Sequence, residues 1–298
     1  MLSTSTRRVA VVVHPTQPVD EAFRALGRWA GRHGIDVVQL ELEGVQREVA
    51  AFRKAEPGDL VVALGGDGTV LSALRAAAAS DAPVLGVACG SLGALSAVSG
   101  EELLEALDRF GAGDWTVRSL PALAVRASGA PDDWAVNDFV VVRRGSGQIV
   151  AEVAVDGELY VRLAGDGLAV ATPIGSSAYS MAAGGPLLAA NTPVFVCTPV
   201  AMHGGSAPPL VVPAHASLTV EVQVGYAGFG VEIDGHRRPV EATSFRLTRQ
   251  ENKVKLVTFS PSGATLGTLR RRGLISDSPR VLARDDRRQQ AVGRGQLP

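Results

Sequence analysis

The chain has 298 residues, which suits one large domain or two smaller ones, and 46% of them are hydrophobic. Its 29 lysines and arginines balance 30 aspartates and glutamates, for a formal net charge of −1. This balance argues against a nucleic-acid-binding protein with a strongly basic surface. The two cysteines lack the spacing of metal ligands, and the apolar run near the N-terminus is too short for a signal or a membrane span. We therefore expect a reduced, cytoplasmic protein without membrane contact.

Strands and helices alternate in the predicted structure of the first 113 residues. Apolar runs predict buried strands at 7–14, 35–42, 59–64 and 83–89. Helical spacing of apolar residues predicts helices at 20–34, 45–55, 69–80 and 101–113. This alternation is typical of an α/β domain with a parallel sheet and helices on both faces, and we place that domain at residues 1–113.

The pattern changes near Trp115, where short β-rich runs separated by turn residues begin. These runs occupy 115–127, 133–144, 147–172, 215–224, 229–235, 244–250 and 253–260. They predict a largely antiparallel, β-rich domain at 114–262, interrupted at 172–190 by a small-residue segment with a short helix. Residues 263–298 form a C-terminal extension, which is polar and rich in arginine and glutamine from about Pro279 and is expected to be disordered from there.

One predicted strand ends in Gly65-Gly66-Asp67-Gly68-Thr69, directly before a helix. The glycines allow a close approach to the main chain, and backbone N–H groups at a helix N-terminus favour phosphate. A carboxylate repels phosphate, so Asp67 makes sense here if it accepts a proton from a hydroxyl or holds Mg²⁺. The alternative is a structural turn in which Asp67 or Thr69 caps the helix. No lysine follows the loop, which argues against a P-loop NTPase.

A second glycine-rich segment, residues 165–186, contains Asp166 and then, after a strand, Ser177-Ala178-Tyr179. Its hydroxyl and free backbone groups could line a pocket for a polar ligand, and the ring of Tyr179 could lie beside a base. Taken alone, the segment also fits a glycine-rich crossover with Tyr179 packed in the core.

A polar pair, Asn137 and Asp138, interrupts a run of β-forming residues at 134–144. An asparagine can pair with the edge of an adenine through two hydrogen bonds, and an aspartate can bind a ribose hydroxyl or an amide. The alternative is a β-bulge or an exposed strand face.

Together and in this order, the three segments resemble the NAD kinase (ATP-NAD kinase) family over roughly residues 8–260. LGGDGTVL resembles the family's GGDGT loop, and NDFVV resembles its Asn-Glu/Asp motif. DGLAVATPIGSSAYSMAAGGP is similar to the family's long segment from Asp-Gly-Leu to Gly-Gly-Pro, and EIDGHR to the late Asp-Gly turn of its β-domain. The resemblance implies a Rossmann-like α/β domain, an antiparallel β-domain and an active site between them.

The resemblance also implies a reaction. It is the Mg²⁺-dependent transfer of a phosphoryl group from ATP, or from another donor, to the adenosine 2′-hydroxyl of NAD, in a homodimer or homotetramer. By position, Asp67 would be the base or would orient the acceptor hydroxyl. The residues around it, Gly65, Gly66, Gly68 and Thr69, would bind phosphates.

The same resemblance assigns the acceptor side to the β-rich domain. Asn137 and Asp138 would hold the adenosine end of NAD. Asp166 would contact its nicotinamide or ribose region, and residues 177–179 would line the acceptor pocket.

Four places depart from the family's pattern. Cys89 replaces a polar Asn region, and Ala94 stands where a Phe is common, so the acceptor pocket would be larger or differently shaped. Pro208 stands where we expect an Arg, which removes a fixed cation or an ion pair. Ser177 replaces a usual Thr and Asp138 a common Glu, and both changes are mild.

Three alternatives to an NAD kinase stay open. A lipid kinase shares a GGDGT loop but would need an apolar cleft and membrane contact. A related kinase could act on another nucleoside or sugar, and a nucleotide-binding module could bind without turnover.

Overall fold

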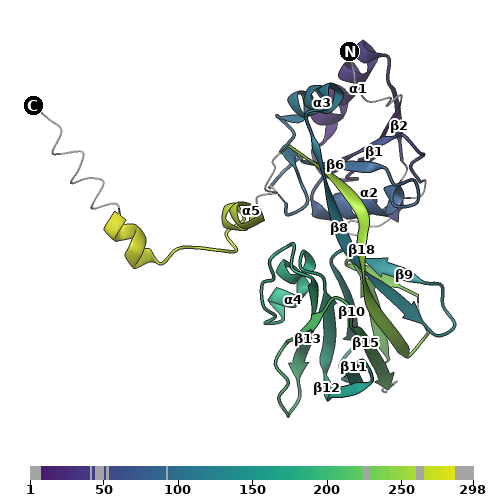
Figure 1. Ribbon diagram of the computed structural model, residues 1–298, viewed down its shortest axis with the longest axis vertical. Coiled ribbons are helices and arrows are strands. Elements are labelled where there is room, and N and C mark those ends of the chain that lie inside the picture. Colours follow the sequence, from purple (N-terminus) through teal and green to yellow (C-terminus); the bar gives the residue numbers. More distant parts are fainter. Residues whose placement is uncertain are drawn as a thin grey trace, which may run out of the picture.

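The structure is a computed structural model that describes residues 8–40, 42–43, 50–51, 54–91, 93–223, 228–239, 241–259 and 265–285. Figure 1 shows two halves stacked along the long axis, with helices around a sheet in the upper half and mainly strands in the lower one. We call them the α/β half and the β half. The sequence predicted both kinds of architecture in this order.

The α/β half is built on a parallel sheet in the order β2-β1-β5-β6. Its strands are β1 (Arg8–Val13), β2 (Asp36–Gln39), β5 (Leu60–Gly65), β6 (Pro83–Ala88) and the short β7 (Val98–Ser99). Its helices are α1 (Asp20–His33), α2 (Asp67–Ala77) and α3 (Leu103–Ala112). One apolar cluster packs α2 on one face, and a second packs α1 and α3 on the other, so the strands are buried on both sides as parallel strands require.

One predicted helix of this half is wrong. The stretch 45–55 does not form a helix through Ala50 and Ala51, because these residues form β4 (Ala50–Ala51), which pairs antiparallel with β3 (Leu42–Glu43). Residues 44–49 and 52–53 lie outside the described part of the chain. Strand pairing between distant segments overrides the local helical spacing here.

The β half is antiparallel, as predicted, in the order β17-β16-β10-β12-β11-β15-β18. Its first strands are β9 (Asp133–Ala135), β10 (Asp138–Arg143), β11 (Ile149–Val155) and β12 (Glu158–Ala171). The later ones are β13 (Val194–Met202), β14 (Leu210–Pro213), β15 (Ser217–Gln223), β16 (Phe229–Ile233) and β17 (His236–Arg238). The pairing of β13 with β12 and β14 was not foreseen.

Two long strands, β8 (Thr116–Ala127) and β18 (Ser244–Thr258), connect the halves (Figure 1). They pair antiparallel with each other over most of their length, with a register shift between Gln250 and Val254. The end of β18 also pairs parallel with β6 of the α/β half, while its start pairs with β15 of the β half. The two halves therefore share one continuous sheet.

The C-terminal extension returns to the junction of the halves. There α5 (Thr265–Arg271) places Leu269 in a site where it is only 3% exposed. The expected disorder from about Pro279 is wrong for 279–285, which are helical, with the carbonyl of Ser278 accepting from the N–H groups of Val281 and Leu282. A serine followed by proline suits a helix start. Residues 286–298 lie outside the described part, and no described helix is long and apolar enough to cross a membrane.

Candidate active site

Asp67 is the first residue of α2, after the N-cap Gly66, at the carboxyl end of β5. Its half-buried carboxylate accepts hydrogen bonds from the backbone N–H of Ala94 at 2.8 Å and of Leu95 at 3.0 Å. Each oxygen takes one of these bonds and keeps a second lone pair for another partner. The loop after β6 therefore fixes the orientation of the carboxylate.

Two glycines make this arrangement possible. A Cβ atom at Gly93 would lie 1.9 Å from Asp67 Oδ1, and one at Gly65 would lie 2.4 Å from Thr69 Oγ1. Gly68, in contrast, has open space around a built Cβ, so packing alone does not require it. Gly93 lay in a stretch that the sequence analysis examined only for its departures, and the contact across the chain was invisible there.

The N-terminus of α2 has the properties of an anion site. The first N–H groups of a helix have no partner within it, and the helix dipole favours negative charge there. The hydroxyl of Thr69 is buried and bonds no described residue. These features agree with the predicted phosphate-binding role of the loop.

The Asn137–Asp138 pair lies against a buried carboxylate that the sequence analysis quoted only as part of a turn. Asp234 accepts from the backbone N–H groups of Val136 at 3.1 Å, Asn137 at 2.7 Å and Asp138 at 3.3 Å. Its backbone is left-handed, with φ 52°, and Gly235 follows. The late Asp-Gly turn therefore orients the backbone of the polar pair.

Arg75, in the last turn of α2, links the Asp234-Gly235 turn to the helix that begins at Asp67. Its guanidinium donates to Asp133 at 2.9 Å, to Asp234 at 3.3 Å and to the carbonyl of Trp134, whose ring it also covers. One helix thus begins at Asp67 in the α/β half and ends on the carboxylates of the β half. Arg75 was missed because its partners are far away in the sequence.

Asp138 is buried beside another carboxylate. Burial and the charge of Asp234 raise the pKa of Asp138 to about 7, although the N–H of Tyr179 partly offsets them. Burial also raises the pKa of Asp234, against the opposing effect of Arg75. Asp138 is therefore able to change charge near neutral pH.

The second glycine-rich segment packs directly on Asn137. Its Gly175 lies in the short helix η1 (Gly175–Ser177), where a Cβ would meet the carbonyl oxygen of Asn137 at 1.9 Å. Ser177 donates its hydroxyl to the carbonyl of Ile174 at 3.1 Å, and Ala178 precedes α4 (Tyr179–Ala182). Tyr179 is 37% exposed, so the core reading of this residue is wrong and its ring has a solvent-facing side.

Asp166 lies apart from this group of contacts. Its carboxylate accepts from Arg143 at 2.6 Å and lies 3.6 Å from Nε2 of His203. It still influences the pocket, since burial first and then the charges of Glu232, Asp138 and Asp166 raise the pKa of Tyr179. The structure therefore gives Asp166 an ion pair, while its predicted contact with a ligand stays a prediction.

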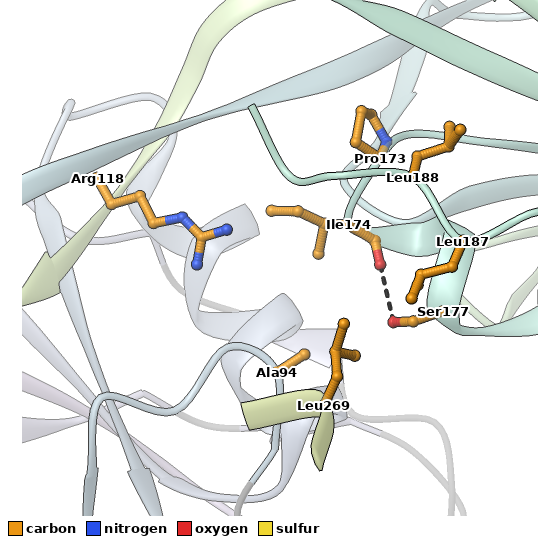
Figure 2. Close-up of a pocket in the computed structure, with 8 residues that line it drawn as sticks. All are labelled: Ala94, Arg118, Pro173, Ile174, Ser177, Leu187, Leu188 and Leu269. Carbon is orange, nitrogen blue, oxygen red and sulfur yellow. Dashed lines mark hydrogen bonds between the residues drawn. The ribbon is translucent and has the colours of Figure 1, made fainter. Parts of the chain in front are cut away.

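The departures from the family's pattern have structural counterparts. Ala94 lines a small cavity between the halves, together with Ile174, Ser177 and, from the C-terminal extension, Leu269 (Figure 2). Leu269 occupies space on the side of the small Ala94 side chain. Elsewhere, the carbonyl of Pro208 accepts from the hydroxyl of Tyr160.

The described residues contain no group of three His, Cys, Asp or Glu side chains that could hold a metal ion. Mg²⁺ commonly binds through one or two carboxylates together with substrate phosphates rather than in a protein cage. Asp67 beside an anion site fits that mode, and a site made of protein ligands alone does not fit these residues.

Two family models match the chain. The ATP-NAD kinase N-terminal domain matches residues 9–115, and the ATP-NAD kinase C-terminal domain matches residues 136–259. An NAD kinase of Koribacter versatilis is 34% identical over 269 residues, covering 86% of this chain and 94% of that protein. An NAD kinase of Chlorobium phaeovibrioides is 34% identical over 262 residues, covering 85% of this chain and 92% of that protein.

Solved structures share the fold. Yeast NADH kinase complexed with NADH superimposes with a TM-score of 0.76 at 20% identity, covering 91% of this chain and 89% of that one. An NAD kinase from Archaeoglobus fulgidus in complex with ATP gives 0.70 at 24% identity, covering 89% and 99%. The family models and the relatives thus define a nucleotide-binding phosphotransferase that acts on an alcohol group, and the fold agrees with that class. Within that class, the chain belongs to the ATP-NAD kinase family.

Proposed function

We propose that this protein phosphorylates the 2′-hydroxyl of the adenosine ribose of NAD to give NADP, with ATP as the phosphoryl donor. The observation that carries the proposal is the position of the Asp67 carboxylate. It stands at a helix N-terminus suited to phosphate and is held by Ala94, a residue that also lines the cavity between the halves. The relatives named as NAD kinases, 34% identical over most of the chain, support NAD as the acceptor.

In the proposed mechanism, Asp67 accepts the proton of the acceptor hydroxyl as that oxygen attacks the donor's terminal phosphorus. The bond from that phosphorus to the bridging oxygen breaks, and ADP leaves with the bond's electron pair. The two backbone N–H groups hold the carboxylate in place, which matters because phosphoryl transfer depends mostly on positioning and charge stabilisation. The loop of Gly65, Gly66, Gly68 and Thr69 binds donor phosphates. Bound Mg²⁺ would neutralise charge on those phosphates.

The acceptor lies on the β half in this proposal. Asn137 and Asp138 bind the adenosine, and the Ser177–Tyr179 segment forms the wall of the pocket, because Gly175 brings it against the backbone of Asn137. Asp166, joined to Arg143, contacts the nicotinamide or ribose end.

Product analysis by mass spectrometry tests the proposal. Purified protein is incubated with Mg·ATP and, separately, NAD, NADH, adenosine, other nucleosides, inositol and diacylglycerol. NADP formed from NAD is the expected result. A different phosphorylated product with NAD unchanged would contradict the acceptor and keep the kinase chemistry. Absence of ATP consumption with every acceptor would contradict both.

We also propose a cytoplasmic homo-oligomer, either a dimer or a tetramer. Large apolar side chains are exposed on the β half, with Leu159 at 46% and Val211 at 43%, and such residues support an interface between copies. Cys89 and Cys197 are free thiols, which suit a reducing compartment. Light scattering coupled to size-exclusion chromatography measures the oligomeric state, and a monomer at micromolar concentration would contradict it.

A further inference from the structure

The cavity between the two halves contains a cation that the mechanism above does not use. Arg118 extends from β8 and points its guanidinium into the space between Ile174 and Ala94, with Leu269 beside Ala94 (Figure 2). The rest of the cavity wall that the figure labels is apolar apart from Ser177. A guanidinium that faces apolar walls loses part of its hydration and needs an anion to compensate.

The guanidinium of Arg118 lacks such a partner within the described part of the chain, where no side-chain hydrogen bond or ion pair joins it to another residue. Burial lowers the pKa of Arg118, and no carboxylate raises it again. The other arginines near the site differ, since Arg75, Arg143 and Arg238 each donate to an aspartate. Among the described residues, Arg118 is thus a cation at this junction whose guanidinium is free to bind a ligand anion.

Three sequence segments near the cavity lack positively charged residues, so the charge of Arg118 matters there. Neither lysine nor arginine occurs in residues 64–74 (the GGDGT loop and the start of α2), in residues 86–99 (from the end of β6 through β7) or in the second glycine-rich segment (165–186). On the nearby α5, Arg270 already pairs with Asp277. Phosphates bound among these segments would need positive charge from another element, and Arg118 of β8 lines the cavity that these segments share.

The position of Arg118 relative to Asp67 follows from a shared neighbour. Ala94 donates its N–H to the Asp67 carboxylate and also lines the cavity into which Arg118 points. On the other side, the same cavity reaches Ser177, the first residue of the proposed acceptor wall. An anion in this cavity would lie between the proposed base and the proposed acceptor site.

We propose that Arg118 binds a phosphate group of the bound nucleotide in the cavity between the two halves. The planar guanidinium can donate two parallel hydrogen bonds to one phosphate, which a lysine cannot reproduce. The phosphate belongs either to the donor triphosphate or to the pyrophosphate of the acceptor. This inference rests on the proposed function, because it assigns a residue to the same nucleotide site.

The first experiment measures anion binding without catalysis. Isothermal titration calorimetry follows inorganic pyrophosphate binding to the full chain and to its Arg118→Met and Arg118→Lys variants. Methionine keeps the length of the side chain and suits an apolar cavity. We expect Arg118→Met to bind roughly 10- to 100-fold more weakly, since hydrogen bonds to charged groups contribute that much, and Arg118→Lys to fall between it and the wild type.

Arg126→Met is the matched control, because Arg126 lies on the same strand and its ion pair with Asp132 is solvent-exposed. It should bind pyrophosphate like the wild type. Equal pyrophosphate affinity in Arg118→Met and the wild type would overturn the proposal, and so would equal weakening in both methionine variants.

Steady-state kinetics then identify the source of the phosphate. A rise of the KM for ATP alone assigns Arg118 to the donor, and a rise of the KM for NAD alone assigns it to the acceptor. Guanidinium ions should partly restore an Arg118→Ala variant, an effect that a merely structural arginine would not show. Unchanged kcat and KM values in Arg118→Met would overturn the proposal while the proposed function stands.

The two proposals fail in different ways. If the wild type forms no NADP but binds pyrophosphate through Arg118, the acceptor assignment is wrong and the anion site stands. If NADP forms equally well without Arg118, the anion site is wrong and the acceptor assignment stands.

Discussion

Asp67 in the α/β half and Asp138 in the β half are both carboxylates of the candidate site, but their surroundings differ. Asp67 is half-buried and accepts hydrogen bonds from two backbone N–H groups, which fix its orientation. Asp138 is 5% exposed and lies beside Asp234, so its pKa rises to about 7. One half therefore fixes the orientation of a carboxylate, whereas the other holds a carboxylate that can be neutral near pH 7. The two should respond differently to the same change to an amide.

Asp67→Asn should have the largest effect on activity. Removing a positioned base lowers kcat by roughly 10²- to 10⁴-fold, with ATP and NAD binding largely retained. The new amide would also direct an NH₂ group at the N–H of Ala94 or Leu95, which costs about 1–3 kcal/mol of folding stability. Kinetics at a temperature where the variant is folded, checked by circular dichroism, measure the first effect. Wild-type turnover would show that Asp67 has only a structural role.

Asp138→Asn should act on stability, with a dependence on pH. An acid with a raised pKa in the folded state stabilises the fold while protonated, so wild-type stability falls as the pH rises from about 4 to about 7. The asparagine variant lacks this loss. A rise of the pKa from 3.8 to about 7 corresponds to on the order of 4 kcal/mol. The free energy of unfolding of the variant, relative to that of the wild type, should therefore be greater at pH 8 than at pH 4 by this amount.

Urea unfolding of both proteins across this pH range measures that gain. Asp133→Asn is the control, because the pKa of Asp133 is shifted in the opposite direction. Burial pushes the pKa of Asp133 up, but Arg75 and Arg238 outweigh it and hold the pKa below its usual value. The loss of stability in that variant should stay constant from pH 5 to pH 8 and shrink only at lower pH. A pH-independent difference for Asp138→Asn would contradict the assigned burial effect.

Gly93→Ala should move the Asp67 carboxylate without removing it. The added Cβ would lie 1.9 Å from Asp67 Oδ1, so the side chain or the loop must shift. A displacement of about 1 Å at a reacting group can cost on the order of 100-fold in rate. Gly90→Ala, on the same loop and with nothing within 4 Å of its Cβ, should keep wild-type activity. Similar kcat values in the two variants would argue against the need for a fixed carboxylate.

Tyr179→Ala should have the smallest effect, limited to the acceptor. Tyr179 is 37% exposed, and its backbone N–H lowers the pKa of the neighbouring Asp138 carboxyl, which places the residue at the proposed adenosine site. Loss of an aromatic contact with a base corresponds to about 0.5–1.5 kcal/mol, or roughly a 2- to 10-fold rise of the KM for NAD. The KM for ATP should stay constant, and an unchanged KM for NAD would remove Tyr179 from the acceptor pocket.

The sequence was sufficient for features that depend on local pattern. Buried strands and amphipathic helices of the α/β half, the antiparallel character of the β half and the GGDGT loop were all predicted from neighbouring residues. The helix across Ala50 and Ala51 was wrong because strand pairing with Leu42–Glu43 is a tertiary effect. The strands β13 and β14 were not recognised in a stretch rich in proline and glycine.

The contacts that build the site could not be predicted in the same way. Gly93 looks like an ordinary loop glycine until its Cα is seen beside Asp67. Arg75 reaches Asp133 and Asp234, 58 and 159 residues away. Asp234 was visible as an Asp-Gly turn, but the three N–H groups from which it accepts hydrogen bonds lie 96 to 98 residues earlier, around the start of β10. Each of these residues acts through a partner that local periodicity does not reveal.

The shared sheet also affects the order in which the chain can fold during synthesis. The edge of β6 is paired by Lys255 and Leu256 of β18, and β8 finds most of its partners in the same strand. A ribosome would release the whole α/β half long before these residues emerge. Until then the sheet of that half keeps an open edge, which is the kind of surface that pairs with other chains. A fragment that ends near residue 115 should therefore aggregate, although a family model matches it as a domain of its own.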